Sequence, residues 1–244
     1  MPIATAQPDR QERKGIPHYL IGHVDPLANT YSAGQYEREA IHLLQKLFKK
    51  YPTIILTGGT GLYIDAVIKG LDEFPEVDFA IRSGLQEELE TLGLRHLLQE
   101  LDTKDPAYAK IVDRQNPRRI IRALEFIRST GLPFSSFRKN KPKQRFFETT
   151  TILLERERPI LYDRINRRVL QMVEAGLIEE AKKWYPHRNL NATQTVGYKE
   201  LFEYFDGTIS LDRAIALIQQ NTRRYAKRQL TWFRKRRIDI RINR

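Results

Sequence analysis

The most constraining stretch of the chain is residues 52–70, where a short apolar run meets a cluster of glycines and a second apolar run follows. Residues 53–57 are apolar or β-branched with no polar alternation, which is typical of a strand covered on both faces of a parallel sheet. Gly58, Gly59 and Gly61 end this run, and apolar residues restart at helical spacing from Leu62. The sequence therefore predicts a central strand, a tight glycine turn and a helix.

The turn from Gly58 to Gly61, with Thr60 inside it, is a candidate phosphate site. Backbone N–H groups at a helix N-terminus lack intrahelical partners and carry partial positive charge, and glycines let an anion approach them closely. Thr60 adds a hydroxyl donor. The turn matches neither a Walker A loop nor a dinucleotide-binding fingerprint, so a simple packing turn between strand and helix remains the alternative.

Positive charge is concentrated in two segments of a chain whose formal net charge is +12. Residues 217–244 hold ten Lys or Arg and one acidic residue, and residues 118–145 hold nine and one, whereas residues 71–105 hold ten acidic and three basic residues. Such segregation is typical of a protein that binds a polyanion, and nucleic acid is the first candidate because phosphate contacts dominate its affinity. A solvated charged face is the alternative.

Length and composition set further limits. A chain of 244 residues can bury a substantial core, and the absence of cysteine excludes disulfides, cysteine-ligated zinc and a thiol nucleophile. The N-terminal residues are polar, and no run of about 18 apolar residues occurs. We therefore expect a cytoplasmic protein.

The pattern predicts an α/β fold with a helical insertion. A helix capped by Ser32 precedes residues 53–57. Residues 149–154 are a second predicted buried strand, and residues 238–242 are a predicted half-buried strand. We expect a core domain of residues 1–77 and 141–244 that ends in a helical C-terminal region, and a helical insertion over residues 78–140. Within the insertion, an acidic helix is interrupted near Gly93. Asn116-Pro117 and Gly131 mark the ends of another helix.

Two helices present basic faces. On the helix after Pro117, guanidiniums at spacings of three and four form a candidate phosphate clamp, from Arg118, Arg119 and Arg122. In the last long helix, one face bordered by Trp232 collects Arg224, Lys227, Arg228, Thr231 and Arg234.

Four motifs in a fixed order resemble the tRNA dimethylallyltransferase family. They are ILTGGTGLY at 55–63, NPRRIIRALE at 116–125, VGYKE at 196–200 and TRRYAKRQLTWFR at 222–234. The opening stretches IATAQP at 3–8 and GIPHYL at 15–20 are also similar to the family's pattern. The resemblance extends from end to end of the chain.

The resemblance implies transfer of a dimethylallyl group from dimethylallyl diphosphate to N6 of the adenosine immediately 3′ of the anticodon in tRNA. It implies a nucleotide-binding, P-loop-kinase-like parallel sheet core, an insertion that closes on the anticodon stem-loop, and Mg²⁺ bound with the diphosphate. Apart from the resemblance, we expect a monomer. An allylic diphosphate must lose a highly charged leaving group, so donors and cations around that group are the main requirement. The target base must leave its stack to react.

By the same resemblance, Thr60 and Arg82 match the family's catalytic threonine and arginine, and the diphosphate-binding turn is Gly58, Gly59, Thr60 and Gly61. The stretches that match the family's tRNA contacts contain Arg118, Arg119, Arg122, Gln194, Thr195, Gly197, Tyr198, Lys199, Arg224, Lys227, Arg228, Gln229, Thr231, Trp232 and Arg234.

The sequence departs from the family's pattern at its start. The family begins with a strand, a Walker-type phosphate loop and an acidic general base, and this sequence contains none of them. We therefore expect Met1 to be an internal methionine or a truncated start, and the sheet core to be incomplete at the N-terminus. A catalytically inactive tRNA-binding fragment is the alternative to the enzyme.

Overall fold

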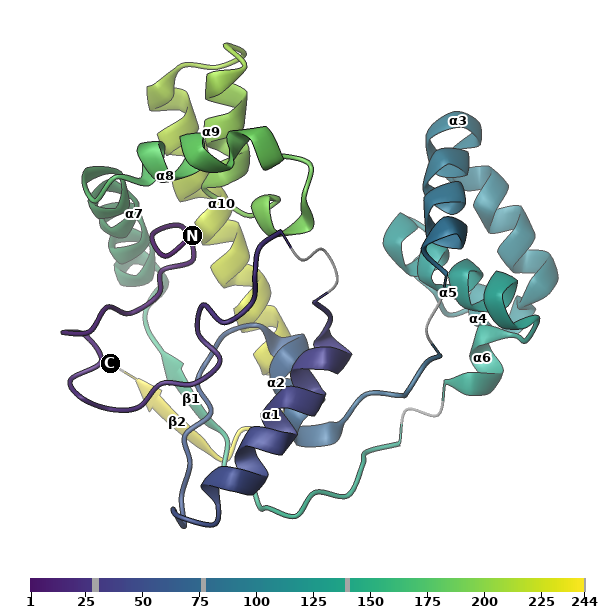
Figure 1. Ribbon diagram of the computed structural model, residues 1–244, viewed down its shortest axis with the longest axis horizontal. Helices are drawn as coiled ribbons and strands as arrows, with labels where there is room; N and C mark the ends of the chain where they lie inside the picture. The colour runs from purple at the N-terminus through teal and green to yellow at the C-terminus, as the bar shows by residue number, and fades with distance from the viewer. Residues whose placement is uncertain (28–30, 76–77, 139–140, 244) are drawn as a thin grey trace. The chain divides into compact units, whose positions relative to one another are not determined.

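The computed structural model describes residues 1–27, 31–75, 78–138 and 141–243, which fall into two compact units (Figure 1). The first unit combines Met1–Ile68 with Arg145–Arg244, and the second is Lys69–Gln144. The domain limits expected at residues 77 and 140 themselves lie outside the described residues. Within the described ranges, no helix combines the length and apolar character needed to cross a membrane.

The first unit is mainly helical. Its N-terminal part holds α1 (Ala33–Leu47) and α2 (Gly61–Lys69), and Ser32 caps α1 as expected by accepting from the Gln35 amide at 3.2 Å. Its C-terminal part holds α7 (Arg158–Glu174), α8 (Leu177–Trp184), α9 (Tyr198–Phe205) and α10 (Leu211–Arg234), with two 3₁₀ turns, Tyr185–His187 and Asn191–Thr193, between α8 and α9.

A core of buried side chains holds α7 to α10 together. It consists of Val169, Leu177, Ala181, Tyr198, Leu201, Phe202, Ala214 and Ile218. The N-terminal residues attach to this core through Glu180, whose carboxylate accepts from the Ile3 and Ala4 amides at 3.0 and 2.9 Å. The N-terminal half of the long helix α10 is therefore packed in this core.

The sheet is small. Strands β1 (Ile152–Glu155) and β2 (Ile240–Asn243) pair in parallel, with Ile152 opposite Ile240. Both strands lie within or beside the predicted runs at 149–154 and 238–242, and the parallel pairing agrees with the expected α/β class. The expected burial of β1 is not observed, because Leu154 is 66% exposed.

The prediction of a strand at residues 53–57 is wrong. Figure 1 shows the segment between α1 and α2 as an irregular connection and not a strand. Ile55 within it is 86% exposed. An apolar, β-branched run favours extended backbone, but a strand also needs hydrogen-bonded neighbours. In the described part of the chain, the only ladder joins β1 to β2.

The second unit is a helical bundle of α3 (Phe79–Lys104), α4 (Pro106–Ala109), α5 (Pro117–Thr130) and α6 (Phe134–Phe137). The predicted signals of α5 are confirmed, since Asn116 accepts from the Arg119 amide and Gly131 adopts the left-handed conformation. The predicted interruption of α3 is also confirmed, because Gly93 has a φ of 80°.

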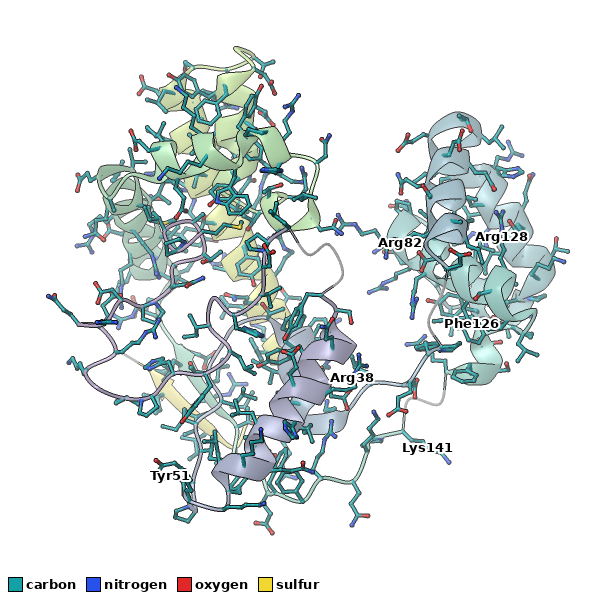
Figure 2. All side chains as sticks on the ribbon, viewed as in Figure 1. Arg38, Tyr51, Arg82, Phe126, Arg128 and Lys141 are labelled. Atoms are coloured by element: carbon teal, nitrogen blue, oxygen red, sulfur yellow. The ribbon has the colours of Figure 1, made fainter. Side chains whose placement is uncertain are left out.

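One arginine joins the two halves of α3 across this interruption. Arg128 of α5 donates to Glu88 before the kink at 2.7 Å and to Glu100 after it at 3.0 Å (Arg128 is labelled in Figure 2). The two carboxylates raise the pKa of Arg128, and the arginine lowers the pKa of Glu88. The folded-back shape of α3 is thus stabilised by charge as well as by its apolar face.

The kink gives a stability prediction with an internal control. Gly93 has φ 80° and ψ 170°, a region that is essentially restricted to glycine, so Gly93→Ala should destabilise the protein by about 1–3 kcal/mol. Gly84 lies in the same helix, and a Cβ there would meet no atom within 4 Å, so Gly84→Ala should stabilise it by about 0.5–1 kcal/mol. Urea unfolding followed by circular dichroism measures both. Shifts of the same sign would contradict the strain at Gly93.

Candidate phosphate and RNA site

The glycine turn packs directly on α10, and this contact requires glycine at two positions. A Cβ at Gly59 would overlap the amide of Gln229, and a Cβ at Gly61 would overlap the indole of Trp232. Figure 1 shows α2 beside the C-terminal part of α10, where these side chains lie. Gln229 and Trp232 are three residues apart, so they share the face of α10 that touches the turn.

Thr60 also makes contact with α10. Its Oγ1 lies 3.2 Å from the hydroxyl of Tyr225, a residue 165 positions away in the sequence. The Arg228 guanidinium lies over the ring of Tyr225, 5.6 Å from the centroid. Tyr225 is not among the residues predicted from the sequence, although its position one helical turn before Gln229 places it on the same face.

Trp232 is held between the turn and an ion pair. The Arg236 guanidinium stacks over the indole at 4.8 Å and donates from Nε to Asp65 of α2 at 3.0 Å. The indole Nε1–H is buried and, within the described part of the chain, has no hydrogen-bond partner. Stacking of this kind stabilises the arginine and the aromatic ring together. The pair therefore fixes α2, and with it the turn, against α10.

Arg145 fixes α2 from a second direction. Its Nη2 donates to the Ala66 carbonyl at 2.7 Å and to Glu37 of α1 at 2.8 Å, and both charged side chains are largely buried. One ion pair, Asp65–Arg236, and one hydrogen bond, from Arg145 to the Ala66 carbonyl, thus connect α2 to its neighbours. The N-terminal end of α2 is rigidly placed while Thr60 itself remains exposed.

The expected RNA face of α10 lies exposed beside this turn. Its exposed members are Arg224, Lys227, Arg228, Thr231 and Arg234, whereas Gln229 and Trp232 are half-buried against the turn. The structure therefore brings together, in one unit, the turn predicted for a diphosphate and the helix face predicted for RNA.

The stretch that precedes α9 is only partly accessible. Gln194 and Lys199 are exposed and Thr195 is half-buried, but Gly197 and Tyr198 are buried. The Tyr198 hydroxyl donates to Glu180 at 2.9 Å, and burial together with this carboxylate raises the pKa of Tyr198. The side chain of Tyr198 is therefore not accessible to RNA. It packs in the core beneath this stretch, and we do not include it among the proposed contacts.

In the second unit, one buried carboxylate lies between two arginines. Glu125 is 3% exposed; its Oε1 lies 3.3 Å from Nε of Arg82, and its Oε2 lies 3.4 Å from Nη1 of Arg122. Arg122 also stacks over Phe74 at 5.2 Å. Arg82 is paired with Glu125 by charge and is 64% exposed, so its guanidinium is available to a ligand (Arg82 is labelled in Figure 2).

The three arginines of α5 are not equivalent. Arg118 and Arg119 are exposed at the start of the helix, while Arg122 is tied to Glu125 and Phe74. A guanidinium has five N–H donors in a fixed plane, so Arg122 keeps donors for a phosphate after pairing with the carboxylate. The expected clamp is thus accessible at all three positions.

The described residues contain no group of three or more His, Asp or Glu side chains that could enclose a metal ion. Magnesium at phosphate-transfer sites is usually bound by one or two carboxylates together with substrate phosphates and water. An ion held mainly by phosphate oxygens would be compatible with the described residues.

Comparison with known proteins identifies the class. Among solved structures, the tRNA isopentenylpyrophosphate transferase of Bacillus halodurans is 39% identical with a TM-score of 0.67, and the match covers 100% of this chain and 77% of that one. A eukaryotic dimethylallyltransferase acting on tRNA is 27% identical with a TM-score of 0.74, covering 95% and 60%. The expected P-loop-kinase-like α/β class is confirmed by this likeness.

Comparison with related sequences shows the family to which the chain belongs. The tRNA dimethylallyltransferase of Christiangramia forsetii is 50% identical over 235 residues, or 96% of this chain and 78% of the relative. The tRNA dimethylallyltransferase 1 of Bacteroides fragilis is 48% identical over 233 residues, or 96% and 77%. The model of the IPP transferase family matches residues 1–236, and the chain belongs to this family. The enzyme class expected from the motifs, a prenyl transferase, is confirmed.

The packing of the turn gives a second stability prediction. Gly61→Ala should destabilise the protein by about 1–3 kcal/mol, because the new methyl group would displace Trp232 from its position under Arg236. Gly58→Ala should change stability little, because a Cβ at Gly58 meets no atom within 4 Å. Thermal unfolding of the two variants measures the difference. Equal midpoints would show that the turn does not rest on Trp232.

Proposed function

We propose that this chain transfers a dimethylallyl group from dimethylallyl diphosphate to N6 of the adenosine immediately 3′ of the anticodon in tRNA. The observation that best supports this proposal is that the turn that contains Thr60 packs against α10. Because of this packing, the turn that we propose as the diphosphate site lies beside an exposed basic face. The names of the relatives agree with this activity and favour it over an inactive RNA-binding fragment.

The chemistry explains why donors around the diphosphate matter most. The bond between C1 of the dimethylallyl group and a diphosphate oxygen breaks, a bond from C1 to N6 forms, and the proton lost by N6 passes to the departing diphosphate or to water. Negative charge accumulates on the departing diphosphate, so preorganised donors around it lower the barrier most. The backbone amides of the turn and the Thr60 hydroxyl are such donors, and they lie at the N-terminus of α2, where the helix dipole also favours an anion.

The second unit would supply further positive charge. We propose that Arg82, oriented by the buried Glu125, stabilises the charge on the leaving diphosphate, and that Arg118, Arg119 and Arg122 contact tRNA phosphates. Exposed Gln194, Lys199 and the basic face of α10 would contact the anticodon stem-loop.

We also propose that Mg²⁺ accompanies the diphosphate, held mainly by its oxygens. The proposal needs the residues of one chain only, so we propose a monomer that works in the cytoplasm.

Single-turnover transfer to an anticodon stem-loop tests the function. The 244-residue chain is mixed with dimethylallyl diphosphate, Mg²⁺ and the stem-loop, and the RNA mass is followed by mass spectrometry. A gain of one dimethylallyl group per stem-loop is expected. Binding of the stem-loop without any mass gain would instead support an inactive RNA-binding fragment.

Loss of the Thr60 hydroxyl should affect turnover alone. Thr60→Ala should slow transfer by roughly ten- to a thousandfold, the range for removing one preorganised donor, and leave tRNA affinity unchanged. Thr57→Ala is the matched control, because Thr57 is also exposed but precedes the turn. An equal loss of tRNA binding in Thr60→Ala would remove Thr60 from the diphosphate site.

Loss of a cation from α10 should affect RNA binding and its salt dependence. Lys227→Ala should weaken stem-loop binding at all salt concentrations. It should also reduce the magnitude of the slope of log K, the binding constant, against log salt by about one, because each phosphate contact releases counterions. Lys183→Ala on α8 removes an equally exposed lysine outside the proposed face and should leave the slope unchanged. Identical slopes for the two variants would show that Lys227 does not lie at a phosphate.

A further inference from the structure

We propose that Tyr225 is a positioning residue for the transfer reaction, and that its hydroxyl orients the proton of Thr60 toward the diphosphate. This inference rests on the proposed function. Its geometric basis is the 3.2 Å distance between the Tyr225 hydroxyl and Thr60 Oγ1, which connects the exposed part of α10 to the glycine turn.

Counting donors fixes the direction of this hydrogen bond. Each hydroxyl has one proton and two acceptor positions, so either residue can donate when the pair is alone. A diphosphate oxygen only accepts. Once Thr60 donates its single proton to the anion, its oxygen can only accept from Tyr225. The order is then Tyr225 to Thr60 to diphosphate, and hydrogen bonds in such a chain strengthen one another.

The surroundings hold the tyrosine in this role. Arg228 lies over the ring at 5.6 Å, and a cation over an aromatic face is attracted to it. Gln229 and Trp232, on the same face of α10, meet Gly59 and Gly61 and keep the turn at this distance from the helix. The hydroxyl pair is thus a consequence of rigid packing on both sides of Thr60.

An exposed tyrosine among arginines could instead stack on a base of the RNA, since Tyr225 is 40% exposed. The two roles depend on different parts of the side chain. Stacking needs the ring, whereas positioning needs the hydroxyl, so Tyr225→Phe separates them.

The first experiment combines Tyr225→Phe with Thr60→Val in a double-mutant cycle. Tyr225→Phe alone should slow single-turnover transfer by about two- to tenfold, the usual effect of one neutral hydrogen bond, and leave stem-loop affinity unchanged. In a Thr60→Val background the same substitution should cause no further loss, because the hydroxyl that Tyr225 orients is gone.

A matched control is available in Tyr162, whose ring lies under Arg223 at 5.9 Å and away from the turn. Tyr162→Phe should leave transfer unchanged. A loss in Tyr225→Phe that persists in full in the Thr60→Val background would overturn the inference, as would a loss of stem-loop affinity equal to the loss of rate.

A second measurement does not depend on turnover. Inorganic pyrophosphate offers the same oxygens to Thr60, and its dissociation constant by calorimetry should rise about two- to tenfold in Tyr225→Phe. No transfer by the wild-type chain would reject the proposed function. Equal pyrophosphate affinity of wild type and Tyr225→Phe, including binding by neither, would reject the positioning role.

Discussion

The contact between the glycine turn and α10 is the constraint on which the proposed site depends. Gly59 and Gly61 have no Cβ, and only for that reason can Gln229 and Trp232 lie against the turn. The helix in turn brings the Tyr225 hydroxyl to Thr60 and leaves its basic side chains exposed on the neighbouring face. One packing contact therefore determines how the turn proposed for the diphosphate lies relative to the helix face proposed for RNA.

Charge has two separate uses in this protein. Buried or half-buried carboxylates hold selected arginines in fixed positions: Glu37 holds Arg145, Asp65 holds Arg236, and Glu125 holds Arg82 and Arg122. A buried carboxylate would be costly alone, so these pairs are mutually required. On α10, by contrast, Arg224, Lys227, Arg228 and Arg234 are exposed, which suits them to counterion release if a nucleic acid binds. The net charge of +12 thus includes arginines paired with carboxylates and cations exposed to solvent.

Local signals in the sequence were reliable where short-range physics decides the outcome. Ser32 and Asn116 each accept a hydrogen bond from the third residue of the helix they precede, and Gly93 and Gly131 adopt the positive φ values that glycine allows. The prediction failed at residues 53–57, because strand formation depends on neighbouring chain segments and not on the segment alone. It was also incomplete at Tyr198, since a motif cannot distinguish a residue that contacts RNA from one buried beneath the contact surface.

By itself the sequence determined the family, the glycine turn with Thr60, the capped helices and the two basic faces, because motifs, caps and helical spacing act over a few residues. Only the tertiary structure decided that the turn rests on α10, that Tyr225 meets Thr60, and that Glu125 lies between Arg82 and Arg122. The Tyr225 contact joins residues 165 positions apart, and the Arg82 contact joins two different helices. Such pairs depend on how helices pack, which no local pattern in the sequence specifies.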